Sequence, residues 1–578
     1  MLVRQPKIPI DVSHSHPPKA MPTLSHTYSL GRLQAQVDIA LADMATRRLL
    51  ERIWKKDYRV WKPAPTEIEN RLGWLTIAEQ MQERVGVLKR FAQSVREAGF
   101  RYVVLLGMGG SSLGPEVLRQ TFGVARGFLK PFVLDSTVPG AIRDVHDAIE
   151  PARTLFLVSS KSGGTIEVMS LFAYFWDVVA RARGNSGGSQ FIAITDPDTS
   201  LGTLAHDRGF RTTFMNPSDI GGRYSVLSYF GLVPAALMGV DVEKVLERAI
   251  AMARLCGPTV APPHNPGAFL GAVMGVLGRA GRDKVTLITS PRIQSFGLWA
   301  EQLLAESTGK QGKGLIPVAQ EPMVVPSAYG EDRLFIALRL DGDANEQVDR
   351  HIARLKRAGQ PVVQLRLQDR ADLGAEFFRW ELATAIAGHY LGIHPFDQPN
   401  VQESKDNTKR ILEHFQREGR LPEIKLNRTL EELFAQIQPR DYVAVLCYLG
   451  PSTKVDAALK AFRRRMVTRY RVATTAGYGP RYLHSTGQLH KGGPNRGVFV
   501  EFTQSPSRDL IIPGAPYTFG TLAQAQAVGD VQSLQSHECR VARIPLGKQP
   551  AVQIKLLGSS ETPHRARPKQ GPSRSRRA

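Results

Sequence analysis

The chain has 578 residues, of which 42% are hydrophobic, and a formal net charge of +22. This length allows two or more domains with large cores. The three cysteines, Cys256, Cys447 and Cys539, are far apart in the chain and odd in number, which argues against a disulfide framework. No apolar run reaches transmembrane length, and no secretory leader is recognisable. We therefore expect a cytoplasmic protein that has no membrane partner.

The positive charge raises the question of nucleic-acid binding. Part of it lies in the last stretch, 561–578, where Arg and Lys alternate with Pro, Gly and Ser and disorder is predicted. Elsewhere the basic residues are spread through helical sequence, and no basic run is interleaved with aromatic residues. Nucleic acid is therefore not expected as a partner. A second interpretation of the positive charge is that it attracts an anionic metabolite.

The predicted elements divide the chain into six parts. Residues 1–27 are rich in Pro, His and Ser and are expected to be disordered, and a helical segment follows. From Phe100 onward short apolar strands alternate with helical patterns, which is typical of α/β domains with doubly wound parallel sheets. A Pro/Gly-rich boundary lies at 257–266. The parts are 1–27, a helical segment 28–99, a first α/β domain 100–255, a second 265–425, an extra α/β portion 426–560 and the basic tail 561–578.

The first strand of the α/β region, Tyr102–Leu106, is followed by a turn rich in Gly and Ser that ends at Gly114. A dinucleotide fingerprint that starts at Gly107 would need glycine at position 112, where Ser112 stands. The hydroxyl groups favour contacts to a phosphate monoester instead.

A second turn of this kind follows the apolar run Leu155–Val158. It reads Ser-Ser-Lys-Ser-Gly-Gly-Thr over 159–165 and leads into a helical pattern from Ile166. A helix start offers unpaired N–H groups and a positive dipole end, and glycine lets the backbone approach a ligand closely. Phosphate binding and an ordinary, well-capped βα loop both fit this turn.

Gln302 and Glu306 stand four residues apart in a predicted helix, Ser295–Ser307, so they share one face. The following loop, 307–314, is rich in glycine and lysine. Glu306 could act there as a base, or it could belong to a solvated surface helix with two solvated lysines.

Arg223 follows two glycines, an arrangement that fixes a cation where an oxyanion develops, although a structural pair with Asp219 is an alternative. Lys405 follows a proline-bounded turn, and His484 follows a glycine-containing turn. No zinc-type spacing of His or Cys is present, so no metal is expected.

Taken together, these segments resemble the phosphoglucose isomerase family, and most of all the isomerase half of bacterial bifunctional transaldolase/glucose-6-phosphate isomerases. The matching segments are 107–115, 159–165, 221–225, 302–310, 396–398 with Lys405, and 483–488. The resemblance implies two sugar-isomerase (SIS-type) domains and cofactor-free, reversible isomerisation of glucose 6-phosphate and fructose 6-phosphate, a reaction of glycolysis and gluconeogenesis. The reaction would pass through ring opening and an enediolate.

The resemblance also implies a role for each matching residue. Glu306 would move the proton between C2 and C1, Arg223 would stabilise the enediolate, and His484 with Lys405 would assist ring opening. Gly110 and Gln302 would contact the sugar. The sugar phosphate would be held by Ser111, Ser160, Lys161, Ser162 and Thr165.

One feature departs from the family pattern. The histidine motif usually stands between the glutamate and the lysine, but here the order is Glu306, Lys405, His484. His394 and His490 are therefore rival candidates. The resemblance also implies a homodimer, in which this histidine can come from the partner subunit, and a possible association with transaldolase. Two further functions stay open: a dual-specificity phosphoglucose/phosphomannose isomerase, and a non-catalytic regulator that binds a sugar phosphate.

Overall fold

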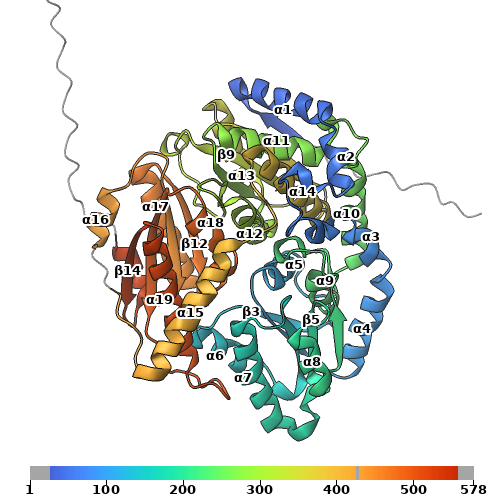
Figure 1. The fold of residues 1–578 in the computed structure, drawn as a ribbon, viewed down its shortest axis with the longest axis vertical. Coiled ribbons are helices and arrows are strands. Elements are labelled where there is room, and N and C mark those ends of the chain that lie inside the picture. The colour runs from blue at the N-terminus through green and yellow to red at the C-terminus, as the bar shows by residue number, and fades with distance from the viewer. Residues whose placement is uncertain (1–25, 425–427, 558–578) are drawn as a thin grey trace, which may run out of the picture.

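The computed structural model describes residues 26–424 and 428–557, which form three sheets of mainly parallel strands covered by helices (Figure 1). The α/β class expected from the sequence is confirmed. Helices near the N-terminus lie along one edge of the molecule. They are α1 (Gln34–Thr46), α2 (Leu49–Trp54), α3 (Ile77–Gln82) and α4 (Val85–Glu97). None of the helices in the described ranges is long and apolar enough to cross a membrane.

The first sheet has the strand order β3-β2-β4-β5-β6, and all of its strands are parallel. Because the chain leaves β2 toward one edge and returns to β4 on the other side, the sheet has a switch point between these neighbours. Ligands of such sheets bind in the crevice outside the carboxyl ends of the strands at that point. The strands are β2 (Tyr102–Gly107), β3 (Lys130–Leu134), β4 (Thr154–Ser159), β5 (Phe191–Thr195) and β6 (Thr212–Met215). The helices of this unit are α5 (Leu113–Phe122), α6 (Pro139–Asp147), α7 (Ile166–Arg183), α8 (Ser200–Asp207) and α9 (Tyr229–Leu237).

The middle sheet has the order β1-β10-β9-β7-β8. Its edge strand β1 (His26–Ser29) is antiparallel to β10, and its rings pack against Phe269. His26 and Thr27 therefore belong to a strand and not to the expected N-terminal tail, whose other residues lie outside the described ranges. The remaining strands are β7 (Lys284–Thr289), β8 (Ile316–Val318), β9 (Arg333–Leu340) and β10 (Val362–Leu367).

The helices around the middle sheet are α10 (Val242–Leu255), α11 (Pro266–Arg279), α12 (Phe296–Thr308), α13 (Glu346–Arg357) and α14 (Leu373–Leu391). The domain boundary expected at residue 255 places α10 in the first domain, but the helix packs on α14 of the middle unit. Its apolar face, which includes Val245 and Met252, joins the core that α11 and α14 share.

The C-terminal sheet has the order β12-β11-β13-β14 and is fully parallel. The strand expected at Tyr470–Thr474 begins only at Ala473, because α17 continues to Tyr470 and ends where Arg471 adopts a φ of 58°. The expected disordered tail 561–578 lies outside the described ranges. The strands are β11 (Tyr442–Tyr448), β12 (Ala473–Tyr478), β13 (Gly497–Gln504) and β14 (Arg540–Leu546).

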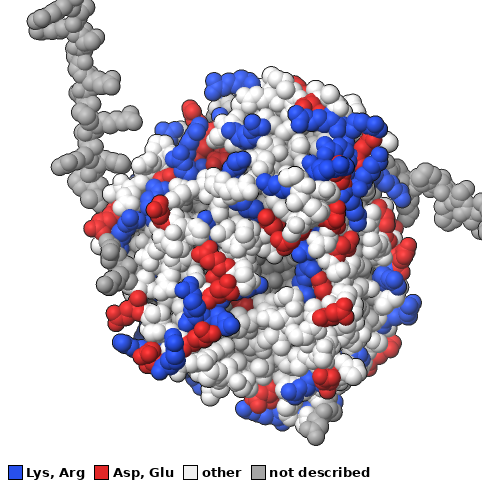
Figure 2. Space-filling view, in the orientation of Figure 1, with Lys and Arg blue, Asp and Glu red and all other residues white. Residues whose placement is uncertain are grey.

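Helix α15 (Pro399–Glu418) joins the middle unit to the C-terminal unit and packs on α19 (Figure 1). The other helices of this last unit are α16 (Leu430–Ala435), α17 (Thr453–Tyr470), α18 (Gly487–Gly492), α19 (Phe519–Ser536) and α20 (Pro550–Leu556). On the face shown in Figure 2, Lys and Arg side chains are interspersed with Asp and Glu.

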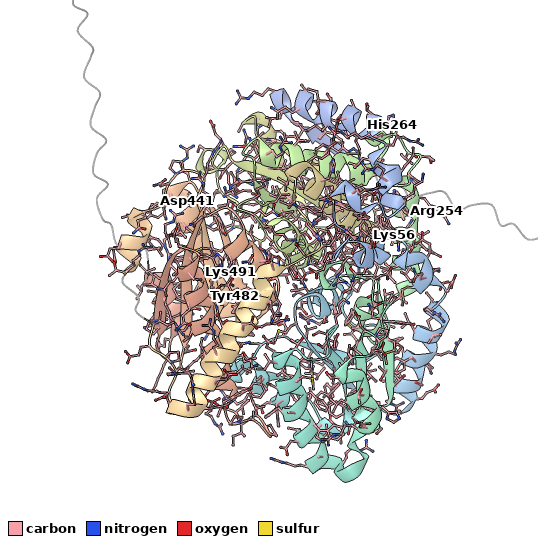
Figure 3. All side chains as sticks on the ribbon, viewed as in Figure 1. Lys56, Arg254, His264, Asp441, Tyr482 and Lys491 are labelled. Atoms are coloured by element: carbon pink, nitrogen blue, oxygen red, sulfur yellow. The ribbon has the colours of Figure 1, made fainter. Side chains whose placement is uncertain are left out.

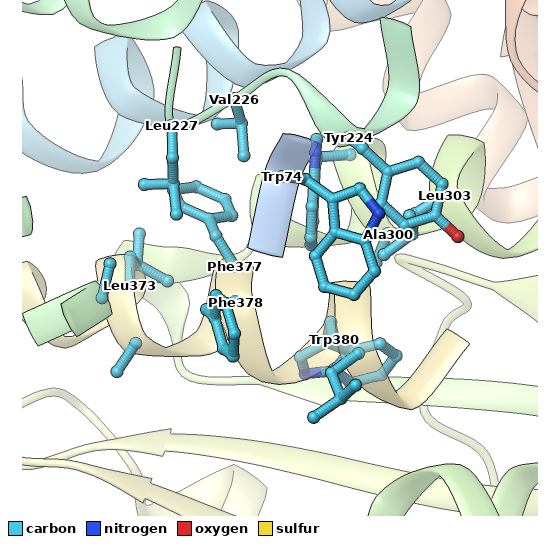
Figure 4. Close-up of a cluster of buried hydrophobic side chains, with 14 of the residues drawn as sticks. Trp74, Tyr224, Val226, Leu227, Ala300, Leu303, Leu373, Phe377, Phe378 and Trp380 are labelled. Atoms are coloured by element: carbon cyan, nitrogen blue, oxygen red, sulfur yellow. The ribbon is translucent and has the colours of Figure 1, made fainter. Parts of the chain in front are cut away.

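The core that supports α12 is rich in aromatic rings (Figure 4). Trp74 stacks on Tyr224 with ring centroids 5.3 Å apart, and Phe378 of α14 lies 6.1 Å from Trp74. Leu303 of α12 belongs to the same cluster. Since burial of each large side chain contributes about 2–3 kcal/mol, this cluster holds α12 firmly against α14 and the segment around Tyr224.

Close contact between α11 and α14 depends on glycine. A Cβ atom at Gly271 would lie 2.7 Å from the carbonyl oxygen of Ala383, so the two helix backbones leave no room for a methyl group. We expect Gly271→Ala to lower the free energy of unfolding by about 1–3 kcal/mol through overpacking. Gly140→Ala in α6, where no atom lies within 4 Å of the new Cβ, should be neutral or stabilising. Thermal unfolding of both variants checks this, and equal melting temperatures would contradict it.

Candidate active site

The two hydroxyl-rich turns meet at the switch point of the first sheet. Gly107 at the end of β2 lies opposite Ser159 at the end of β4, so both turns start from the same edge. Ser160 Oγ and Thr165 Oγ1 lie 3.0 Å apart beside the N-terminus of α7, and Ser111 is buried in the neighbouring turn. Ser162 is exposed on the outside of its turn. The arrangement combines hydroxyl donors with the N–H groups of a helix start, as an anion site requires.

The structure does not bring the Lys161 ammonium to these hydroxyls. It pairs with Asp196 and donates to the carbonyl oxygen of Ser218 at 3.4 Å. Position 110 has no room for a side chain, since a Cβ atom at Gly110 would lie 2.0 Å from the carbonyl oxygen of Gly222. The close approach at Gly110 brings the first turn against the segment that carries Arg223.

Glu306 and Gln302 lie on α12 and are both buried, so the solvated-surface alternative is wrong for this helix. Gln302 Nε2 donates to Glu306 Oε2 at 3.0 Å, and Arg223 Nη1 lies 3.2 Å from Glu306 Oε1. The carboxylate is thus held at both oxygens. Gln302 Oε1 is buried and has no hydrogen-bond partner among the described residues, which leaves an acceptor for a ligand hydroxyl.

Arg223 is 1% exposed, and fixed acceptors surround its guanidinium. Nε donates to Ser307 Oγ at 2.8 Å, and Nη2 donates to the carbonyl oxygens of Pro395 and Asp397 at 2.8 and 3.0 Å. The side chain therefore contacts Glu306 and the turn at 395–397 rather than Asp219, which instead lies 3.4 Å from the Lys56 ammonium. Arg223 can offer a positive charge to a ligand without having to reorganise.

A second buried cation, Lys310, was missed in the sequence. Its ammonium donates to the carbonyl oxygens of His394 and Asp397, both at 2.5 Å, and to Asp397 Oδ1 at 2.6 Å. Burial and the nearby Arg223 charge lower the pKa of Lys310 to about 7, against the opposing effect of Asp397. Its position four residues after Glu306, at the end of the helical pattern, was the available signal.

His484 reaches the site from a short 3-10 helix, Arg481–His484, after β12. Its Nε2 lies 2.8 Å from Glu167 Oε1, and its backbone carbonyl accepts a hydrogen bond from Gln302 Nε2 at 2.9 Å. Burial alone would raise the pKa of Glu167, but the charge and hydrogen bond of His484, with smaller effects that include the charge of Lys405, lower it overall. Glu167 was missed because, in sequence, it is one more acidic residue in the first turn of a helix.

The rival histidines have other surroundings. His394 Nδ1 accepts hydrogen bonds from the backbone N–H groups of Phe396 and Asp397 at 3.1 and 3.3 Å, and its Nε2 lies 3.0 Å from the carbonyl oxygen of Thr66. His490 is packed on Phe499, and burial lowers its pKa to about 3. Of the three, His484 is the one that lines the pocket described next.

A pocket of about 420 Å³ opens between the start of α7, helix α15 and the C-terminal unit. Lys405 is exposed on α15 and lines this pocket together with His484 and Glu167. The pocket wall also includes Thr165, Leu483, Tyr517 and Gln526. The structure thus places Lys405, His484 and the start of α7 around one pocket.

Buried polar contacts hold the His484 segment in place (Figure 3). Tyr482 donates its hydroxyl to Asp530 Oδ2 at 2.8 Å, and Lys491 Nζ lies 2.6 Å from Asp530 Oδ1. Gln488 Nε2 donates to the carbonyl oxygen of Gly309 at 2.9 Å, which links this segment to the end of α12. Within the described ranges we find no group of three or more His, Cys, Asp or Glu side chains that could hold a metal ion.

Comparison with known proteins identifies the family of this chain. The family model described as Phosphoglucose isomerase matches residues 78–319. The glucose-6-phosphate isomerase of Rubrobacter xylanophilus is 30% identical over an alignment of 387 residues that covers 59% of this chain and 89% of that protein. That of Carboxydothermus hydrogenoformans is 28% identical over an alignment of 400 residues that covers 60% of this chain and 85% of that protein. The chain belongs to the phosphoglucose isomerase family.

Solved structures show the same fold. A glucose-6-phosphate isomerase from Chlamydia trachomatis superposes with a TM-score of 0.57 at 19% identity and covers 72% of this chain and 92% of its own. A hypothetical protein from Thermus thermophilus also has a TM-score of 0.57, at 23% identity, and covers 67% and 99% of the two chains. The α/β architecture of this chain is therefore shared with an isomerase of known structure.

The buried pair of Lys491 and Asp530 should stabilise the His484 segment measurably. We expect Lys491→Met to lower the free energy of unfolding by about 3–5 kcal/mol, because Asp530 would stay buried without its cation. Adding Asp530→Asn should recover part of this loss, since the Tyr482 hydroxyl keeps an acceptor. Thermal unfolding of both variants, with the exposed Lys454→Met as control, measures the effect; a Lys491→Met protein as stable as the control would contradict it.

Proposed function

We propose that this chain is a glucose-6-phosphate isomerase, which interconverts glucose 6-phosphate and fructose 6-phosphate. One observation carries the proposal. A buried carboxylate, Glu306, is held by Gln302 and Arg223 beside the His484–Glu167 pair, and Gln302 links the two groups by hydrogen bonds of 3.0 and 2.9 Å. The membership of the family and the named relatives support the same reaction.

Binding would start at the two turns of the first sheet. The phosphate would take hydrogen bonds from the hydroxyls of Ser111, Ser160 and Thr165 and from the first N–H groups of α7, whose dipole favours an anion. Ser162 is exposed beside them and can turn toward the same group. Lys161 would act from a distance, since Asp196 holds its ammonium.

Ring opening would then need a proton moved from the anomeric hydroxyl to the ring oxygen. One ring nitrogen of His484 lies on Glu167, so the other nitrogen can serve the sugar. Lys405 is exposed and lines the same pocket. A histidine and a lysine on one pocket wall provide the acceptor and the donor for this transfer.

Isomerisation of the open chain would be the task of Glu306. The carboxylate takes the proton from C2 and returns it to C1, while Arg223 stabilises the negative charge on the enediolate oxygens. Burial favours this step, because Glu306 is 7% exposed and bulk water cannot readily exchange with the transferred proton. The mechanism requires no redox change, since the aldose and ketose are isomers.

Replacement of the base is the direct test of the reaction. We expect Glu306→Gln to lower kcat for fructose 6-phosphate by about 100-fold or more, because in this direction the amide cannot accept the C1 proton of the ketose. Formation of glucose 6-phosphate is followed with a coupled dehydrogenase. Glu301→Gln, on the same helix but near Arg463, is the matched control and should keep its activity. Full activity of Glu306→Gln would exclude Glu306 as the base, and an inactive wild type would exclude the proposed reaction.

Every proposed site residue belongs to one chain in this structure. The backbone carbonyl of His484 accepts a hydrogen bond from Gln302 of the same chain, which supports a histidine supplied within one chain. We therefore expect a mixture of Glu306→Gln and His484→Ala proteins to stay as inactive as the two variants alone. Recovery of activity after mixing and refolding together, toward one quarter of the wild-type value expected for randomly formed two-site dimers, would show instead that the site is shared between chains.

A further inference from the structure

We propose that Gln526, oriented by Thr137, is a positioning residue that fixes the Glu167–His484 pair for ring opening. The proposal rests on the isomerase function above and assigns a task to the C-terminal unit beyond its supply of His484. Gln526 lies on α19 and lines the same pocket as Lys405 and His484.

The contacts form one continuous chain of buried groups. Thr137 Oγ1 donates to Gln526 Oε1 at 2.7 Å, and Gln526 Nε2 donates to Glu167 Oε1 at 2.7 Å. The same carboxylate oxygen lies 2.8 Å from His484 Nε2. Thr137, Gln526 and Glu167 are all buried, so bulk water does not compete for these hydrogen bonds.

This chain determines how the imidazole is used. An amide nitrogen can only donate, so Glu167 Oε1 must act as an acceptor toward Gln526. His484 Nε2 then fits as a second donor to the same oxygen, which places its proton on Nε2 and leaves Nδ1 for the sugar. The Thr137 hydroxyl favours this amide orientation, because it donates to the carbonyl side of Gln526.

Two units of the fold meet in this arrangement. Thr137 follows β3 and Glu167 starts α7 in the first unit, whereas His484 and Gln526 come from the C-terminal unit. A second link runs parallel to it, since Arg481 lies 3.6 Å from Asp135, two residues before Thr137. The segment after β3 therefore locates both the backbone around His484 and the partner of its side chain.

A matched pair of variants at Thr137 separates orientation from packing. Thr137→Val keeps the shape but removes the hydroxyl, whereas Thr137→Ser keeps the hydroxyl but removes the methyl group. We expect Thr137→Val to lower kcat/KM for glucose 6-phosphate by roughly 10-fold and Thr137→Ser to stay close to wild type. The reverse order, with Ser impaired and Val active, would show that only packing matters and would overturn the proposal.

Gln526→Met tests the amide itself, with Gln532→Met on the same helix as control. If ring opening becomes the slow step, the isotope effect on kcat/KM with glucose 6-phosphate deuterated at C2 should fall toward 1. A mere loss of folded enzyme would leave that isotope effect unchanged, and such a result would contradict the assigned role.

The pH profile gives a further measure. The groups that face Glu167 are His484 from the 3-10 helix, Gln526 from α19 and the positive charge of Lys405 from α15. Loss of the Gln526 donor destabilises the carboxylate anion, so the pair should bind a proton more readily. The acid limb of kcat/KM in Gln526→Met should move to higher pH by roughly one unit.

A readout without turnover keeps this inference separate from the proposed reaction. The ring nitrogens of His484 can be followed by NMR in histidine-labelled protein, and their signals are identified by their absence in His484→Gln. The chemical shifts of these nitrogens report which of them carries the proton, and they should change in Gln526→Met and in Thr137→Val but not in Gln532→Met. Unchanged shifts in both would overturn the positioning role even if the wild type isomerises the sugar, whereas an inactive wild type with changed shifts in both variants would count against the reaction alone.

Discussion

The side-chain amide of Gln302 is the contact on which the candidate site depends. One nitrogen donates to Glu306 on the same helix at 3.0 Å and to the carbonyl oxygen of His484 at 2.9 Å. Glu306 belongs to the middle unit, and His484 belongs to the C-terminal unit. Because both acceptors share one amide, neither unit can move without changing the position of the proposed base relative to the proposed ring-opening histidine.

Buried charge imposes a second constraint around this contact. Arg223 and Lys310 lie beside Glu306, and both are almost fully removed from water. An isolated buried cation is costly. Here the two cations are stabilised by hydrogen bonds to Ser307 and to carbonyl oxygens of residues 394–397, and by contacts with two carboxylates. The backbone turn at 394–397 is thereby pinned between the cations, and Lys405 follows it on α15. The same turn therefore stabilises the buried cations of the site and determines where Lys405 lies.

The fold class could be predicted from the sequence, because apolar runs such as Leu155–Val158 are bounded by glycine and serine and alternate with helical patterns. The motif residues at the switch point could be predicted for the same reason. The short strands β8 and β1 could not be predicted, since a segment of three or four residues is too short to show a reliable hydrophobic periodicity. The packing of α10 on α14 could not be predicted, because an amphipathic pattern shows that a face is buried but not which unit buries it.

Residues that act through long-range contacts were the hardest to find. Glu167 and Gln526 are 359 positions apart, and Thr137 and Gln526 are 389 apart, so no local pattern relates them. Lys310 was considered only as one lysine of the loop after Glu306, because sequence shows neither its burial nor its three oxygen acceptors. The role proposed for each of these residues depends on contacts between segments that are far apart in the sequence.

The unusual order of the motifs has a structural explanation in these contacts. The proposed ring opening would require a histidine at one point in space, beside Glu167 and the amide of Gln302, and would impose no condition on its place in the chain. The C-terminal sheet presents His484 from the carboxyl end of β12, and Asp530 holds the segment through Tyr482 and Lys491. A unit that supplies the proposed histidine must also provide its surroundings. Gln526, from the same unit, meets that requirement.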